Sequence, residues 1–299
     1  MSGKREPVRL DNNRYMELES SFKIYRHRYY TSTDVHWHEF YELGFVISGQ
    51  GKHYLNGKEY PVRRGNIFLL TPIDIHEIVP ATEAPVEIYN VIFKENMLHE
   101  QIFNLLFLAR FEDSKDIVFD LSGDELLDTE REFARLWKEF NQEQIGTKVA
   151  ICSTLNRILL DLARHILKDA GQAEPFKPSS KQAAIMKALV YIQHHFREPL
   201  TLQDMSRITN FAPNYFSACF HEMTGKTFQS FLQDIRLTFA MSLLTASDLA
   251  ITDICYSSGY NTVTHFNRAF KQKYVLSPTE YRKKVKRLHG ATGGLSTGT

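Results

Sequence analysis

Two segments near the C-terminal end of the chain share one pattern of apolar positions. In each segment apolar residues recur at helical spacing, stop at a run of turn-forming residues, and then recur as a second helix. The first segment runs from Pro199 to Gly225 and the second from Ala250 to Tyr274. The matching apolar positions are Leu202, Met205, Phe211, Phe216 and Phe220 in the first, and Ile251, Ile254, Tyr260, Phe266 and Phe270 in the second. The pattern therefore predicts two copies of one helical unit.

The residues between the paired helices indicate that each unit is a helix-turn-helix. Gly259 suits a helix end that needs a positive φ, and Pro213 suits the first turn of a following helix. Two helices joined by such a turn form a unit whose second helix can enter the major groove. Between the copies, Phe228 to Leu244 predicts a long amphipathic helix. Such a helix would hold the two units at adjacent major grooves of one DNA face, about 34 Å apart.

The second copy carries a recognisable set of residues at fixed spacing. These are Ser258-Gly259-Tyr260, Phe266-Asn267-Arg268-Ala269-Phe270-Lys271, Ser277-Pro278 and Tyr281-Arg282. This segment resembles the DNA-binding domain of the AraC/XylS family of bacterial transcription regulators, over roughly 100 residues. Val275 departs from the family, which commonly has Gly at this place, so we expect a strained turn before Ser277.

Polar side chains on the second helix of each unit are the candidate DNA contacts. Phe216, Phe220, Phe266 and Phe270 are predicted to face the core, which leaves the opposite side of each helix available. In the resembling family, the matching positions contact bases and backbone. The candidates are Asn214, Ser217, His221, Thr264, His265, Asn267, Arg268 and Lys271.

Each candidate contact suits a different part of DNA. Arg268 suits a bidentate contact with guanine, and Asn214 and Asn267 suit adenine. His221 and Lys271 suit phosphates. Alternatively, these residues are solvated polar groups on a unit that binds only other proteins.

Charge is distributed unevenly along the chain, although the formal net charge is only +1. Residues 181–287 hold 14 Lys and Arg against 7 Asp and Glu, whereas residues 1–180 hold 22 against 28. A local basic excess favours nucleic acid as the partner, because neutralised phosphates release counterions. A solvated basic face is the alternative.

The N-terminal part of the chain predicts a small antiparallel barrel or jelly roll. Short runs of β-branched and aromatic residues are divided by turn signals, of which Asn56-Gly57 is typical of a type I′ hairpin. The predicted strands are Phe22 to Tyr30, Tyr41 to Ile47, His53 to Leu55, Glu59 to Val62, Ile67 to Leu70, Glu77 to Val79 and Val86 to Phe93.

Inside this region, His36, His38 and Glu42 are followed by Gly49, Gly65, Pro72 and His76. The arrangement resembles the two-part cupin motif, and cupin-type barrels are what the AraC/XylS family often carries as its N-terminal sensor. We therefore expect a small polar effector, such as a sugar or related metabolite, to be bound in the barrel. The predicted effector-binding residues are Arg26, His36, His38, Glu42 and His76.

Two other interpretations of the same residues stay open. In metal-binding cupins the positions matching His36, His38, Glu42 and His76 hold the ion, and imidazoles plus one carboxylate suit a divalent first-row metal. His36 and His38 alternate with Trp37, so both would point to one face of a strand. Ile73 and Asp74 stand where such cupins usually have Gly. The third interpretation is a set of satisfied polar groups at the barrel mouth. For Arg26, an outward-facing position with His27 inward is the alternative.

Two amphipathic helical patterns follow the barrel. Ser122 and Glu125 have the form of a capping box before the first, and Val149, Cys152, Leu155, Leu159, Leu162 and Ile166 form the stripe of the second. Such an apolar pair needs a partner, which would be either the barrel or the same pair in a second subunit. Dimerisation is expected, since family members often dimerise through such helices.

The predicted fold class is α+β, with an antiparallel cupin-like β-barrel, a helical dimerisation segment and an all-α double helix-turn-helix domain. The predicted limits are 1–120 for the sensor, 121–170 for the helical segment, 171–182 for a linker, 183–287 for the DNA-binding domain and 288–299 for a disordered tail.

The predicted function is an effector-controlled, sequence-specific DNA-binding transcription regulator without a cofactor. A metal-dependent cupin enzyme fused to a DNA-binding domain is the alternative. Double-stranded DNA, an effector and a second copy are the expected partners, with RNA polymerase a further candidate. Three scattered cysteines and the absence of long apolar runs favour a cytoplasmic protein without a membrane span.

Overall fold

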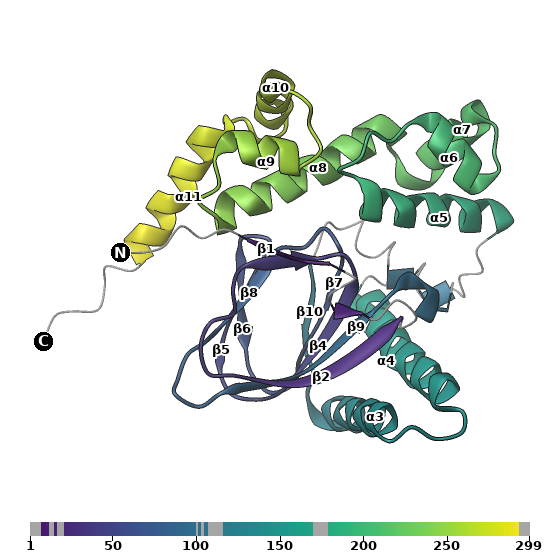
Figure 1. Cartoon of the computed structure of the whole chain (residues 1–299), viewed down its shortest axis with the longest axis vertical. Helices are drawn as coiled ribbons and strands as arrows, with labels where there is room; N and C mark the ends of the chain where they lie inside the picture. The colour runs from purple at the N-terminus through teal and green to yellow at the C-terminus, as the bar shows by residue number, and fades with distance from the viewer. Residues whose placement is uncertain are drawn as a thin grey trace, which may run out of the picture.

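The computed structural model describes residues 7–11, 15–16, 21–99, 101–102, 105–106, 116–169 and 179–292. A β-rich domain is followed by a pair of helices along its side, and an all-helical domain lies across one end of the β-rich domain (Figure 1). The predicted α+β fold class is confirmed. None of the described helices is long and apolar enough to cross a membrane.

In the described residues, ten strands form two five-stranded sheets that face one another as a jelly-roll-like open barrel. The sheet orders are β1-β3-β8-β5-β6 and β10-β7-β4-β9-β2. Only the pair β1 and β3 is parallel among the described strands. The strands are β1 (Val8–Leu10), β2 (Phe22–Tyr29), β3 (His36–His38), β4 (Tyr41–Ser48), β5 (Gly51–Leu55), β6 (Lys58–Val62), β7 (Asn66–Leu70), β8 (His76–Pro80), β9 (Val86–Phe93) and β10 (Ile117–Asp120).

The structure has three short strands that are absent from the predicted set. One is β3, which carries the alternation of His36, Trp37 and His38. β1 lies near the start of the chain and pairs with β3. β10 lies beside β7 at the edge of the other sheet. β1 and β10 are too short to show a clear alternation of apolar and polar residues, and tertiary pairing rather than local pattern defines them.

The predicted hairpin at Asn56-Gly57 is confirmed. Both residues have positive φ, +52° and +78°, as a type I′ turn requires. The turn joins β5 to β6 with Leu55 opposite Lys58.

Two helices, α3 (Gly123–Asn141) and α4 (Thr147–Asp169), cover the outer side of one sheet. Phe133 of α3 stacks on Phe45 and Tyr89 of that sheet, with ring centroids 5.0 and 5.9 Å apart. The pair therefore packs on the barrel, and dimerisation through it stays a prediction. Val149 does not join the packed face, because its side chain is 70% exposed.

The expected capping box at the start of α3 is not formed. Ser122 is the N-cap residue, but its side chain makes no capping bond. Glu125 contacts His165 instead, at 3.1 Å.

The C-terminal domain contains both predicted helix-turn-helix units, α6 with α7 and α9 with α10, joined by α8. All four Phe residues predicted for their cores are fully buried. The helices are α5 (Ser180–His195), α6 (Leu202–Thr209), α7 (Pro213–Thr224), α8 (Phe228–Ala246), α9 (Ile251–Ser257), α10 (Val263–Tyr274) and α11 (Pro278–Thr292).

Two predicted limits differ from the observed helices. α5 begins at Ser180, within the predicted linker, and a capping box of Ser179 and Gln182 fixes this start. α11 continues to Thr292, so residues 288–292, predicted as part of a disordered tail, are helical. Residues 170–178 and 293–299 lie outside the described residues.

Replacement of Val275 by Gly should stabilise the protein. Val275 ends α10 with φ +67°, and its side chain is 79% exposed, so it gains little from packing. A left-handed conformation costs an L-residue roughly 1–2 kcal/mol, and the extra freedom of Gly in the unfolded chain offsets part of the gain. We expect Val275→Gly to raise the free energy of unfolding by about 1 kcal/mol, measured by urea denaturation.

Val275→Ala is the matched control, because Ala keeps the Cβ atom that makes this conformation unfavourable. It should give a smaller gain than Gly. A denaturation midpoint for Val275→Gly at or below that of the wild type would contradict the strain at this turn.

Candidate sensor site and DNA-binding surface

Four histidines and one glutamate meet inside the barrel. His36 and His38 lie on β3, Glu42 on β4, His53 on β5 and His76 on β8. His36 pairs directly with His76 in the register of β3 and β8. His38, Glu42, His53 and His76 are buried, and His36 is partly exposed. The four residues predicted from the motif are therefore brought together, and His53 is added to them.

The donor atoms of the cluster lie close to one carboxylate oxygen. Oε2 of Glu42 is 3.5 Å from Nε2 of His38 and 3.9 Å from Nε2 of His76. His36, Glu42 and His76 each offer one ligand atom, and these atoms all lie within 4.8 Å of one another. The Nε2 atoms of His38 and His76 are buried and have no hydrogen-bond partner in the part of the chain that the structure describes.

The other ring nitrogens are held by hydrogen bonds that fix the orientation of the rings. Nδ1 of His36 lies 2.7 Å from the carbonyl oxygen of Asp34, and Nδ1 of His38 lies 2.7 Å from that of Phe40. A carbonyl only accepts, so these Nδ1 atoms carry the proton and Nε2 keeps its lone pair. Nδ1 of His76 faces Nε2 of His53 at 3.2 Å. When Nδ1 of His76 donates to His53, Nε2 of His76 also presents a lone pair to the site.

Burial keeps the cluster uncharged near neutral pH. It lowers the pKa of His38 and of His53 to about 3, with the neighbouring His36 as a second cause, and it lowers the pKa of His36 and His76. Burial also raises the pKa of Glu42 to about 8, although a hydrogen bond with Asn90 acts in the opposite direction. The contact between His38 and Glu42 is therefore between neutral groups and is not an ion pair. A buried carboxylate becomes favourable beside a cation or where several hydrogen bonds hold it.

The loop before His76 is well fixed although it lacks the Gly usual in metal-binding cupins. The carboxylate of Asp74 accepts hydrogen bonds from the backbone N–H and the hydroxyl of Thr71, at 2.6 and 2.9 Å. It also accepts one from the side chain of Asn56 at 2.6 Å. Three hydrogen bonds to Asp74 thus fix the conformation of a loop that has no Gly, and His76 still points into the barrel.

Arg26 does not join this cluster, contrary to the prediction. Its side chain is exposed, forms an ion pair with Glu87 at 2.8 Å and lies over the ring of Tyr89. The alternation along β2 sends Arg26 and Arg28 outward, where both contact Glu87. His27 stacks between Tyr25 and Tyr29. We therefore exclude Arg26 from the sensor site.

His53 was missed because the motif does not include it. Its signal in the sequence is weak but real: His53 and Leu55 alternate with polar residues on β5, and both are buried. A histidine on the apolar face of a strand is one that points into a barrel.

The proposed DNA-reading side chains lie on the exposed sides of α7 and α10. Seven of the eight candidates are exposed, and Ser217 is partly buried. Both helices lie on the side of the C-terminal domain away from the barrel (Figure 1). Arg268 forms no ion pair with any described residue. The ring of His265 also contacts Tyr260, with centroids 5.4 Å apart.

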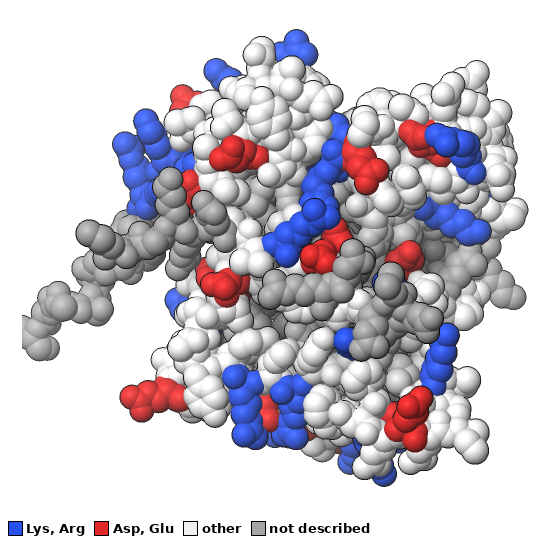
Figure 2. Space-filling view, in the orientation of Figure 1, with Lys and Arg blue, Asp and Glu red and all other residues white. Residues whose placement is uncertain are grey.

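Two further features of the C-terminal domain suit a polyanion. Tyr215 follows Asn214 on α7, and its side chain is 52% exposed. Tyr215 is not among the predicted DNA contacts, since an aromatic residue beside a core position is usually taken as buried. Figure 2 shows Lys and Arg side chains gathered at the edge formed by α11, which carries the exposed Lys283, Lys284, Lys286 and Arg287.

Both halves of the chain match known families. Residues 20–114 match a family model described as an AraC-like ligand binding domain, and residues 205–284 match one described as a helix-turn-helix domain. The chain is a transcription regulator of the AraC/XylS family. The two matches confirm the resemblance seen in the sequence of this AraC/XylS regulator. They support a DNA-binding regulator rather than the enzyme alternative.

Individual relatives of this AraC/XylS regulator share about a third of its residues or fewer. It is 32% identical over 127 residues to the HTH-type transcriptional regulator YisR of Bacillus subtilis. The aligned segment is 42% of this chain and 43% of YisR. It is 26% identical to YfiF of the same organism, over 85% of this chain and 80% of that protein. The match therefore spans less than half the length of YisR. Among solved structures, ToxT from Vibrio cholerae is 16% identical over 88% of this chain and 98% of its own, with a TM-score of 0.40.

Proposed function

We propose that this regulator binds operator DNA through α7 and α10 and controls transcription according to the occupancy of the histidine cluster. The exposed polar sides of the two helices, with Arg268 at the centre of the second, support the first part. The convergence of buried imidazole lone pairs on Glu42 supports the second. A cytoplasmic location belongs to the same proposal, because a regulator must reach the bacterial chromosome.

We further propose that the occupant of the cluster is a divalent first-row metal ion. Bonds of such an ion to imidazole nitrogen and carboxylate oxygen are roughly 2.0–2.2 Å long, so two ligands of one ion lie roughly 3–4 Å apart. The spacings of 3.5 and 3.9 Å around Oε2 of Glu42 fall in this range. Three imidazoles and one carboxylate are also a suitable donor set.

The hydrogen bonds that orient the histidine rings are those that a metal site requires. Ligating histidines generally donate their other ring N–H to a carbonyl, a carboxylate or a further group, which fixes the ring. Here, the ring of His36 donates to the carbonyl of Asp34 and the ring of His38 to that of Phe40. The ring of His76 faces that of His53. An ion would also provide the charge that lets buried Glu42 ionise, so the raised pKa of Glu42 is consistent with a place intended for a cation.

A small polar effector, for example a sugar, is the second candidate. The family match to a ligand binding domain favours an organic ligand, and imidazole and carboxyl groups suit hydroxyls. The close spacing of the donor atoms favours the ion instead, because a hydroxyl-rich molecule needs these groups further apart. Dimerisation through α3 and α4, and contact with RNA polymerase, are further parts of the proposal that need separate tests.

Metal binding can be measured directly on the purified, chelator-treated chain. We expect about one Co²⁺ per chain, with the visible absorption bands of a low-symmetry site, and competition by Zn²⁺. Glu42→Gln should abolish this binding, since the amide is neutral and a poor ligand. His53→Ala should weaken it by about 10–100-fold, the usual effect of removing a group that orients a ligand.

His27→Ala is the matched control, because His27 is a half-buried imidazole outside the cluster. It should bind Co²⁺ like the wild type. Binding of a sugar from a panel by metal-free protein, lost in Glu42→Gln, would establish the organic effector in place of the ion. Co²⁺ binding that survives Glu42→Gln would place the ion elsewhere.

DNA reading is tested with Arg268→Ala on a fragment selected from a random DNA pool. A bidentate contact with guanine contributes roughly 1–3 kcal/mol of discrimination, so specific affinity should fall roughly 5–150-fold while non-specific affinity changes little. Lys271→Ala should weaken binding to all sequences and reduce the salt slope by about one.

Arg131→Ala is the control for loss of one arginine. Arg131 lies on α3, is 72% exposed and pairs only with its neighbour Asp128 among the described residues. Its removal should leave DNA affinity unchanged. An unchanged specific affinity for Arg268→Ala would exclude Arg268 as a base contact.

A further inference from the structure

The histidine cluster lies directly behind the boundary between the two domains. Trp37 stands between His36 and His38 on β3, and its side chain therefore points away from the cluster. It makes an edge-to-face contact with Phe239 of α8, with ring centroids 5.5 Å apart. The guanidinium of Arg197, just after α5, lies 4.1 Å from the centre of the Trp37 ring. One strand thus carries two members of the cluster on one face and a contact with the DNA-binding domain on the other.

The segment that presents His76 is tied to the same helix. The backbone N–H of Ile75 donates to Oδ1 of Asn56 at 3.1 Å. The hydroxyl of Ser242 on α8 lies 3.2 Å from the same oxygen, and it shares its one proton between this oxygen and the carbonyl of Thr238 at 3.1 Å. The side chain of Asn56 also donates to Asp74. Asn56 therefore links both residues before His76 to α8 through one amide group.

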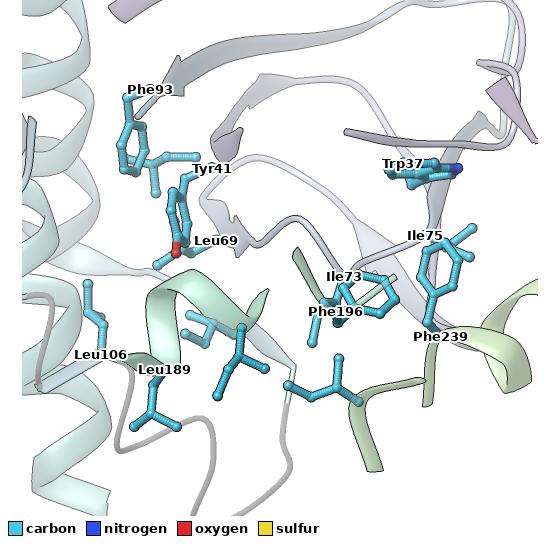
Figure 3. Packing of buried hydrophobic residues seen from close by; sticks show 14 of the residues in the cluster. Trp37, Tyr41, Leu69, Ile73, Ile75, Phe93, Leu106, Leu189, Phe196 and Phe239 are labelled. Atoms are coloured by element: carbon cyan, nitrogen blue, oxygen red, sulfur yellow. The ribbon is translucent and has the colours of Figure 1, made fainter. Parts of the chain in front are cut away.

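Apolar packing fills the space between the aromatic contact of Trp37 and the hydrogen bond of Asn56, so that the two contacts belong to one interface. Ile73 and Ile75 of the sensor domain point toward Phe196 and Phe239 of the DNA-binding domain (Figure 3). All four residues are buried in one hydrophobic cluster. A buried, close-packed interface transmits small displacements instead of absorbing them.

Helix α8 is placed to pass such displacements to both DNA-binding units. Phe228 at its start packs on Phe216 and Phe220 of α7, at 6.2 Å between ring centroids. Asp234 pairs with Lys273 of α10 at 2.7 Å, and the carbonyl of Leu237 accepts a hydrogen bond from the hydroxyl of Tyr274. The side of α8 that meets the sensor domain carries Phe239 and Ser242.

Two clefts lie along the boundary, next to buried members of the cluster. One of about 290 Å³ is lined by His38 of the sensor and by Gln193 and Arg197 of the DNA-binding domain. Another of about 460 Å³ is lined by His76 and by Thr245 and Lys286. Each cleft has one wall from each domain, so both clefts change shape if the domains move relative to each other.

We propose that β3 and the segment 73–76 couple the occupancy of the histidine cluster to the position of α8, and so to DNA affinity. This inference rests on the proposed sensor function. A ligand held by His36, His38 and His76 fixes β3 against β8, and both strands contact α8 through Trp37 and Asn56. Because binding linkage is reciprocal, DNA must change the affinity of the cluster by the same factor.

The coupling is measured as the ratio of DNA affinities with and without saturating Co²⁺, in the full chain. Co²⁺ absorption reports occupancy, and fluorescence anisotropy of a selected DNA fragment reports affinity. For the wild type we expect a ratio that differs from one by about 5–150-fold in either direction, the usual range of allosteric coupling. Ser242→Ala removes the hydrogen bond to Asn56, and Phe239→Leu loosens the contact with Trp37. Each should bring the ratio toward one.

Ser230→Ala is the matched control, because Ser230 lies on the exposed side of α8 near its start and should keep the wild-type ratio. Both interface variants should still bind Co²⁺, since neither residue belongs to the cluster. The two substitutions are independent, so a folding defect in one leaves the other decisive.

The outcomes separate the inference from the function on which it rests. Co²⁺ binding with an unchanged DNA affinity overturns the coupling and leaves the metal site standing. A full wild-type ratio in both interface variants overturns the route through α8. Failure of Co²⁺ to bind removes the proposed metal and the coupling with it.

Discussion

The alternation of side chains along β3 is the constraint on which the sensor domain depends. Successive residues of a strand must point to opposite faces, so His36 and His38 enter the barrel only if Trp37 leaves it. Trp37 would be a large exposed apolar group if the barrel stood alone. Its burial under Phe239 and Arg197 solves that problem and fixes the DNA-binding domain against the sensor. The three residues of β3 thus have two roles: His36 and His38 belong to the cluster, and Trp37 contacts the DNA-binding domain.

The electrostatics of the cluster follow from the same burial. Imidazoles taken out of water lose their proton, and a carboxyl group taken out of water keeps it. The site is therefore neutral as a unit, and its four imidazoles and one carboxyl group add no charge to the interior of the barrel. The hydrogen bonds that the imidazoles donate to Asp34, Phe40 and His53 maintain the geometry in this neutral form, so a cation would meet a nearly preformed set of ligand atoms.

Local patterns in the sequence were sufficient for the elements that repeat or alternate. The paired Phe positions located both helix-turn-helix units, and Asn56-Gly57 located the hairpin. The motif from His36 to His76 identified four members of the cluster. What local pattern could not show was set by tertiary contact. β1 and β10 exist because they pair with strands that are distant in the sequence. Arg26 turns outward to pair with Glu87, and Glu125 contacts His165 instead of capping a helix with Ser122. His53 lay outside any motif, and the contact of Trp37 with Phe239 joins residues about two hundred positions apart.

Gly57 is restricted from two independent directions. Its φ of +78° already disfavours every L-residue, and a Cβ atom there would lie 2.6 Å from a methyl carbon of Thr245 in the other domain. A change at this position would therefore do more than weaken a hairpin, because it would wedge the sensor away from the last turn of α8. In related chains, the residue at position 245 should accordingly vary together with the turn, since the two domains share the space that a single methyl group would fill.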